Sequence, residues 1–215
     1  MTFEFSPNKA MLKNMNSKKL IERADLEALL KLLLETDSFR PDSIIDSERP
    51  DFIITVPDRT IGVETTRSEP EEYFRALSIQ ASKYPSHWIN ITHFKNRLSP
   101  RTNKELLNSM GYNALLQPWE SVEAGMLQWK QEIAVTLNTK REKLNQTGYQ
   151  IFDENWLLIH NYHPLCNDKL TQERAGQLLN DLFFEVSGVT RDFDAIFVHS
   201  GAFLFRWQMG ELCLI

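Results

Sequence analysis

Residues 47–66 have the sequence SERPDFIITVPDRTIGVETT. Two segments within it, 52–56 and 61–66, are rich in β-branched and aromatic residues, which favour β-strands. Between them, Pro57, Asp58 and Arg59 are residue types that favour a tight turn. The stretch therefore predicts a β-hairpin, and it is the best hairpin signal in the chain.

The turn position sets which side chains of this hairpin face one another. A turn centred on residues 58–59 would pair Val56 with Ile61. With that register, Asp51 and Glu64 become diagonal neighbours on one face of the hairpin, and the opposite face is almost wholly apolar. The apolar face is expected to pack on the protein core.

Asp51 and Glu64 are candidate metal ligands. Diagonal neighbours on paired strands have Cα atoms about 7–8 Å apart, and their carboxylate tips can come closer. Carboxylate oxygens are the ligands that Mg²⁺ and Mn²⁺ prefer. In a competing interpretation Asp51 only caps a strand beside Pro50 and Glu64 only faces solvent, and the spacing alone does not choose between the two.

Composition indicates one folded domain, residues 1–215. The hydrophobic fraction of 42% and the charged fraction of 25% are ordinary for a globular protein. A net charge of −5 argues against non-specific coating of nucleic acid, although a local basic groove is compatible with it. Cys166 and Cys213 form no metal-binding pair, there is no signal-peptide pattern, and no segment has the roughly 20 apolar residues of a membrane span. A cytoplasmic protein with no membrane contact is expected.

A helix is predicted from Lys18 to about Glu35, with Ser17 as its cap. Its apolar stripe is centred on four leucines. Glu22 lies on the edge of the inward face and is a candidate member of the site. The equally supported alternative is a partly exposed first-turn acid that the helix dipole favours.

Periodicity weakens over residues 68–120, which we interpret as a large insertion after the hairpin. A helix is expected over residues 71–83. Aromatic and basic residues alternate over residues 87–97, and they could line a substrate channel. Packing of these aromatic side chains on the core is the more common arrangement.

The next helix is predicted over residues 121–144 and carries a candidate site lysine. Its apolar stripe includes Trp129, Ile133 and Leu137, and Lys140 lies near the middle of that stripe. A buried lysine needs a carboxylate, a phosphate or water nearby. In the alternative, the Lys140 side chain extends past Leu137 to solvent.

The same helical wheel displaces Lys143 toward the flank of the apolar stripe, and it points Arg141 away from that stripe.

The remaining pattern predicts an α/β fold. Residues 155–160 are expected to form a buried central strand. A helix is predicted over residues 171–187, and strands over 193–199 and 202–208 are expected to pair with each other. The order is helix, strands, insertion, helix, strand, helix, hairpin, which indicates a mixed β-sheet flanked by helices.

A transition-metal site is a weaker possibility in the sequence. His160, His163 and Cys166 have suitable ligand atoms, but no second Cys or His cluster completes a four-ligand set. A loop with incidental histidines is the favoured interpretation. There is no glycine-rich phosphate-binding loop, nucleophile elbow or zinc-protease motif.

Pro50-Asp51, followed thirteen residues later by Glu64-x-Thr66 at the end of a hairpin, resembles the motif of the PD-(D/E)xK nuclease superfamily. The resemblance covers about residues 17–66 and 120–198. It implies a restriction-endonuclease-like mixed β-sheet flanked by helices, with an α-β-β-β-α-β core. Thr66 occupies the place of the motif lysine, and Lys140 is the replacement that the helix pattern offers.

The resemblance implies a metal-dependent nuclease that hydrolyses phosphodiester bonds, and DNA is expected as its substrate ahead of RNA. Asp51 and Glu64 are then expected to bind Mg²⁺ or Mn²⁺, with Glu22 as a further ligand. Lys140 would orient the attacking water or stabilise charge on the phosphate oxygens, and Thr66 would contribute to substrate binding. A homodimer is compatible with this interpretation.

The alternative is a catalytically inactive nuclease-like fold that acts as a protein or nucleic-acid interaction module. The acidic net charge and the missing motif lysine favour this alternative. The two carboxylates and the inward-facing Lys140 argue against it.

Overall fold

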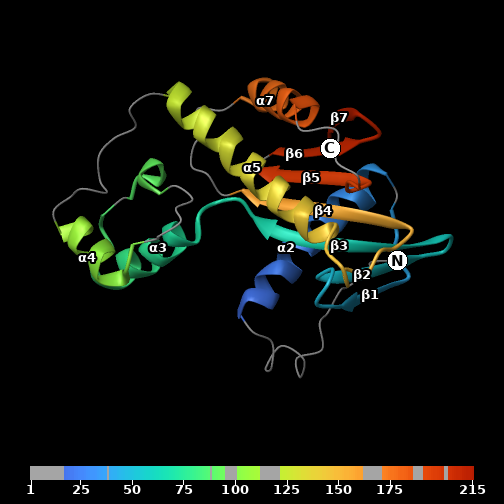
Figure 1. Cartoon of the computed structure of the whole chain (residues 1–215), viewed down its shortest axis with the longest axis horizontal. Helices are drawn as coiled ribbons and strands as arrows, with labels where there is room; N and C mark the ends of the chain where they lie inside the picture. The colour runs from blue at the N-terminus through green and yellow to red at the C-terminus, as the bar shows by residue number, and fades with distance from the viewer. Residues whose placement is uncertain are drawn as a thin grey trace.

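The computed structural model describes residues 17–37, 39–87, 89–94, 101–111, 122–161, 171–185, 191–200 and 203–215. Over these residues the chain forms an α/β fold, in which five α-helices and a short 3-10 helix accompany one seven-stranded sheet (Figure 1). The elements are α2 (Ser17–Thr36), β1 (Ser43–Asp46), β2 (Phe52–Val56), β3 (Arg59–Arg67), α3 (Glu71–Lys83), η1 (Ile91–His93), α4 (Asn103–Gly111), α5 (Val122–Leu144), β4 (Glu154–Asn161), α7 (Gln172–Glu185), β5 (Ala195–Ser200), β6 (Phe203–Gln208) and β7 (Glu211–Leu214).

The order of the strands across the sheet is the same as their order along the chain. β3, β4 and β5 are parallel to one another, and the other neighbouring strands are antiparallel. α3, α4 and α5 lie in the connection from β3 to β4, and α7 lies in the connection from β4 to β5. Such helical crossovers are the usual way to join parallel strands.

The hairpin of β2 and β3 forms, but its register differs from the expected one. Val56 pairs with Arg59, not with Ile61, so the turn contains only two residues, 57–58. The shift along the partner strand is two residues, and side chains alternate with a period of two. Each side chain therefore keeps its expected face although every expected pair is wrong.

One face of the sheet packs on α2. Leu26, Leu29 and Leu33 of this helix are buried against the apolar face of the hairpin. Trp156 and Leu158 of β4 extend the same cluster toward β5 and β6. The predicted leucine stripe of α2 is therefore the stripe that contacts the sheet.

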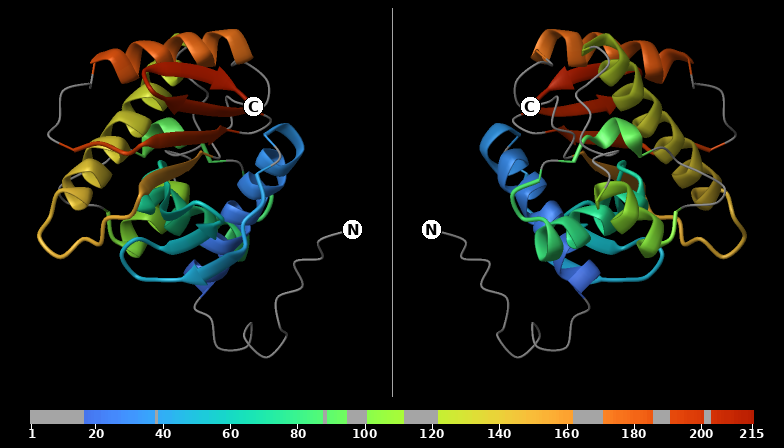
Figure 2. Two further views of the ribbon diagram at one scale, coloured as in Figure 1. Left: turned by 90° about the vertical axis from the view of Figure 1, so that its right-hand side faces the viewer. Right: turned by 90° about the vertical axis from the view of Figure 1, so that its left-hand side faces the viewer.

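The other face of the sheet packs on α5 and α7. Trp129, Ile133 and Leu137 of α5 are fully buried there, together with Leu157 and Ile159 of β4. Because residues 156–159 alternate between the two clusters, β4 is covered on both faces, as its continuous apolar sequence predicts. Figure 2 shows α2 and α5 on opposite sides of the sheet.

The insertion forms a small core of its own, beside one end of the sheet (Figure 1). α3 has the predicted bounds, whereas α4 was not predicted. Tyr73 and Ala76 of α3 pack with Phe94 and with Leu106 of α4. Phe94 is fully buried, so its ring packs in a core and lines no channel. Trp88 and residues 95–97 lie outside the described residues.

The end of the chain adds one strand to the predicted set. Residues 202–208 were expected to form the last strand, but β7 follows β6 and forms the edge of the sheet.

Among the described helices, none has the length and the apolar composition of a membrane-spanning segment.

Candidate functional site

A cleft of about 870 Å³ lies where the carboxyl end of β3 meets α2, α3 and α5. Most of its lining side chains are charged. The acids are Glu22, Asp25, Asp51, Glu64, Glu69 and Glu71, and the bases are Lys18, Arg67, Lys140 and Lys143. The cleft therefore brings together all the site residues that the sequence predicted. These are Asp51, Glu64, Lys140, Glu22 and Thr66.

Asp51 lies at the start of β2, beside Glu64. Continuing the pairing of Phe52 with Val63 by one residue brings Asp51 opposite Glu64, where the sequence predicted diagonal neighbours. The carboxylate oxygen Oδ2 accepts a hydrogen bond from the Thr65 backbone N–H at 2.8 Å. Burial raises the pKa of Asp51, and the charges of Glu64 and Glu22 raise it further. A cation in this cleft would relieve that repulsion.

Glu64 is almost completely buried, with only 1% of its side chain exposed. Its Oε1 atom contacts Lys140 Nζ at 2.7 Å and Lys143 Nζ at 2.5 Å. The Tyr149 hydroxyl donates a hydrogen bond to Oε2 at 3.3 Å. Burial acts to raise the pKa of Glu64, but the two ammonium groups outweigh it, and the pKa is lowered. Glu64 is therefore held as an anion inside the protein.

α5 carries both lysines to the same point. Residues three apart lie on one side of a helix, so Lys140 and Lys143 reach the same carboxylate. Lys140 was predicted to face inward, whereas Lys143 was placed on the flank. Arg141, expected to point away, is buried and forms an ion pair with Asp192.

Glu22 and Thr66 border the carboxylate pair. Glu22 on α2 has ion-pair contacts to Lys18 at 3.3 Å and to Lys19 at 3.7 Å. The Thr66 hydroxyl donates to the Arg67 carbonyl at 3.4 Å. Thr66 has no ammonium group, and Lys140 on α5 supplies one to the cleft.

Lys19 fixes the backbone that carries Asp51. Its ammonium group donates hydrogen bonds to the carbonyl oxygens of Ser47 and Asp51, both at 2.8 Å. It also lies 4.5 Å from the centre of the Phe52 ring. α2 thereby holds the start of β2 in place beside the cleft.

The donor set of the cleft suits a cation that needs few protein ligands. In the described part of the chain, no group of three or more His, Cys, Asp or Glu side chains is arranged to hold a metal ion. Asp51 and Glu64 provide two carboxylates, and Mg²⁺ commonly takes one or two carboxylates and completes its shell with water and substrate phosphate. The residues therefore fit Mg²⁺ or Mn²⁺ as a two-carboxylate site.

The histidine at the end of β4 is not among the residues that line the cleft, but it lies beside one of the cleft acids. His160 is buried, its ring lies 4.5 Å from the His199 ring, and its Nε2 atom is 3.7 Å from Asp25 Oδ1. Burial, with the nearby His199 and Arg67 charges, lowers the pKa of His160 to about 3. His163 and Cys166 lie outside the described residues.

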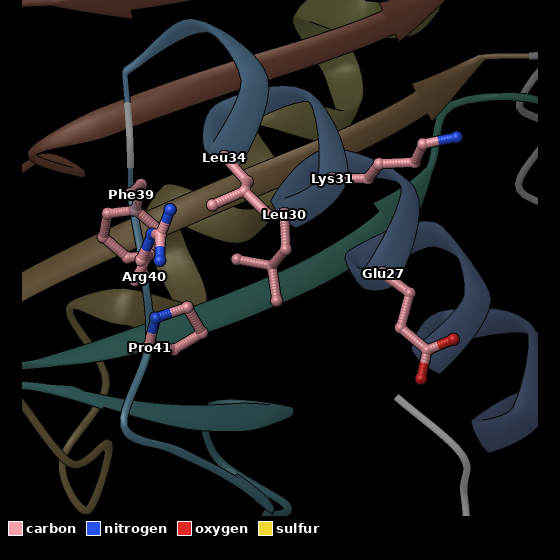
Figure 3. Close-up of a pocket in the computed structure, with 7 residues that line it drawn as sticks. All are labelled: Glu27, Leu30, Lys31, Leu34, Phe39, Arg40 and Pro41. Atoms are coloured by element: carbon pink, nitrogen blue, oxygen red, sulfur yellow. The ribbon is translucent and has the colours of Figure 1, made fainter. Parts of the chain in front are cut away.

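A separate pocket of about 240 Å³ lies between α2 and residues 39–41. Its walls are mainly apolar, and Figure 3 shows the Leu30 and Leu34 side chains on the same side as Phe39 while the Lys31 ammonium extends away. The pocket has one carboxylate, Glu27, and no second acid to pair with it. This pocket therefore lacks the paired carboxylates of the charged cleft.

Sequence reasoning missed two direct contacts of Glu64. Lys143 has a weak signal, since it lies three residues from Lys140 on the same helix. Tyr149 lies in the connection after α5, where no periodicity marks it.

Comparisons of the chain with protein-family models, with curated proteins and with solved structures gave no match. The function is therefore inferred from the chemistry of the cleft.

Proposed function

We propose that the chain is a metal-dependent phosphodiesterase that cleaves nucleic acid, with DNA the first substrate to test, and is a divergent PD-(D/E)xK nuclease with a restriction-endonuclease-like core. The observation that carries this proposal is the meeting of Asp51, Glu64 and Lys140 in one cleft, with Lys140 Nζ 2.7 Å from Glu64. Two adjacent carboxylates can hold a divalent cation, and a lysine beside them can offset charge on a phosphate, which together support metal-assisted phosphodiester hydrolysis.

Each residue has a role that follows from its position. Asp51 and Glu64 would hold Mg²⁺ or Mn²⁺, which when bound supplies an acidic water and offsets negative charge on the phosphate. Lys140 would stabilise charge that develops on the phosphate oxygens. Its ammonium group already pairs with the Glu64 carboxylate, so we assign it an electrostatic role and not that of a base.

Glu22 and Thr66 have supporting roles in this proposal. The Glu22 carboxylate adds negative charge near Asp51 and would serve as an outer acid of the cation site. The Thr66 hydroxyl lines the cleft on the strand that carries Glu64, within reach of a bound substrate.

The space around Asp51 suits a polymer. A second cavity, of about 470 Å³, shares Lys18, Glu22 and Asp51 with the cleft. A phosphodiester has a nucleotide on each side of the scissile phosphate, and two cavities that adjoin at Asp51 offer it more space than the cleft alone. The cleft has four basic side chains for phosphate but also six acids, so attraction for a phosphate depends on a bound cation.

The test is cleavage of single-stranded and double-stranded DNA and RNA in Mg²⁺ or Mn²⁺. Asp51→Asn, Glu64→Gln and Lys140→Met are each expected to reduce the cleavage rate by roughly 10²-fold or more. Asp58→Asn, an exposed acid in the hairpin turn, is the matched control and should keep full activity. Metal-dependent cleavage that survives in Asp51→Asn and Glu64→Gln would refute the assignment.

One observation favours the alternative of a silent interaction module. The Oε1 atom of Glu64 already has two ammonium partners, which would compete with a cation for this carboxylate. If the chain neither cleaves any of these substrates nor binds Mn²⁺, this alternative replaces the nuclease proposal.

A further inference from the structure

Lys143 is a second cation at the carboxylate pair. It contacts the same Glu64 oxygen as Lys140 and lines the same cleft. Its side chain is 30% exposed, compared with 18% for Lys140. Lys143 is therefore the ammonium group with more freedom to move from Glu64 to a ligand in the cleft.

Local charge explains why this lysine has a place there. Two carboxylates, Asp51 and Glu64, face two ammonium groups, Lys140 and Lys143, so these four groups are formally neutral together. The whole cleft has six acids and four bases, so a phosphate anion added alone would meet an excess of negative charge. A divalent cation at Asp51 and Glu64 would offset that excess, but it would have to compete with the two ammonium groups for Glu64. Phosphate binding therefore depends on the cation, and the cation depends on a new partner for the displaced ammonium group.

The contacts also compete directly. A cation that takes Glu64 as a ligand must share or displace the ammonium groups at Oε1. A displaced ammonium needs a new anionic partner, because a partly buried ammonium is costly when unpaired. A phosphate oxygen in the cleft is such a partner.

We propose that Lys143 is a substrate-binding residue that moves from Glu64 to a phosphate oxygen when a divalent cation occupies Glu64, so that metal and phosphodiester bind cooperatively. This inference rests on the proposed function and adds a residue and a binding order to it. Lys140 stays near Glu64 as the less exposed partner, and Lys143 is the group that is exchanged. Cation affinity in the absence of substrate is therefore weak, and substrate raises it.

The test is calorimetric titration of the full chain with Mn²⁺, with and without dimethyl phosphate, a small phosphodiester anion. The anion is expected to tighten Mn²⁺ binding by about fivefold or more, since coupling between sites is typically of that size. Neutral trimethyl phosphate is the matched ligand control and should have no effect. By reciprocity, Mn²⁺ should tighten dimethyl phosphate binding by the same factor.

Variants identify the residue. Lys143→Met should bind Mn²⁺ more tightly than the wild type without anion and should lose the coupling. Lys143→Arg, which keeps the charge, should retain it. Lys130→Met is the control on the same helix, because Lys130 pairs with Glu185 and does not line the cleft. Circular dichroism establishes that each variant is folded.

The outcomes separate this inference from the proposed function. Mn²⁺ binding of equal strength with and without dimethyl phosphate would overturn the coupling while leaving the metal site intact. Coupling that persists in Lys143→Met would overturn the role of Lys143. Absence of Mn²⁺ binding under every condition would overturn the proposed function itself.

Discussion

Glu132 should make the stability of this protein fall as pH rises. This residue lies on α5, near the insertion, and only 4% of it is exposed. Its Oε1 atom accepts a hydrogen bond from Gln128 Nε2 at 2.8 Å, and its Oε2 atom has no hydrogen-bond partner among the described residues. Burial raises the pKa of Glu132 to about 8; the Gln128 hydrogen bond opposes this shift, and the charge of Glu69 adds to it.

The sign follows from comparison with the unfolded chain. Below pH 4.5, the ordinary pKa of a glutamate, both states hold the proton and no stability is lost. Between that pH and about pH 8 the folded protein keeps the proton and the unfolded chain releases it. Each pH unit in this window should raise the unfolding equilibrium constant roughly tenfold, and the loss is complete above the folded pKa.

Glu132→Gln removes this titration and keeps the shape of the side chain. We expect the ratio of wild-type to variant unfolding constants to increase roughly 100-fold between about pH 5.5 and pH 7.5. Urea denaturation at several pH values measures this ratio. The other titrating groups are the same in both proteins, so their effects on the unfolding constant cancel in the ratio. Glu123→Gln, at an exposed acid of the same helix, is the control and should give a constant ratio. A ratio for Glu132→Gln that is also constant would refute the buried-acid reasoning.

Two further substitutions test how the hairpin is held. Gly62→Ala would place a Cβ atom 2.6 Å from Phe152 Cδ2 and 2.9 Å from Pro50 Cγ. We therefore expect urea denaturation to show a free energy of unfolding that is lower by about 1–3 kcal/mol. A variant as stable as the wild type would contradict this close packing. Lys19→Met removes two hydrogen bonds to carbonyl oxygens. We expect thermal and urea unfolding to show a free energy of unfolding that is lower by about 1–3 kcal/mol. Lys18 is more exposed, so Lys18→Met should change the stability little. Equal stability of the two lysine variants would show that Lys19 does not fix the start of β2.

The elements of the fold could be predicted where one pattern dominates a segment. The continuous apolar run of β4 indicates a strand that is buried on both faces, and residues 156–159 do alternate between two cores. The helical spacing of leucines located α2 in the same way. The hairpin register could not be predicted, because the residue types of 57–59 satisfy a two-residue turn as well as a longer one. β7 was missed because four residues at an exposed edge carry little hydrophobic pattern.

Individual site contacts were predictable only in part. Lys140 could be singled out because a lysine in an apolar stripe needs a partner. Lys143 was missed because a helical wheel places the Cα atom, whereas a four-carbon stem lets the ammonium reach around the helix. Arg141 was misplaced because its partner, Asp192, lies 51 residues away and no local pattern connects them. Long-range pairs of this kind depend on the packed fold.

The strand order has a consequence for synthesis on the ribosome. Each strand pairs with the strand made just before it, so the sheet can grow from its N-terminal edge as the chain emerges. The longest interval separates β3 from β4, and during it β3 is an open edge that could join a neighbouring nascent chain. Charged side chains on an edge strand oppose such pairing. Arg59, Glu64 and Arg67 are such side chains on β3, so the acid of the cleft is also one of the charges on the edge of the unfinished sheet.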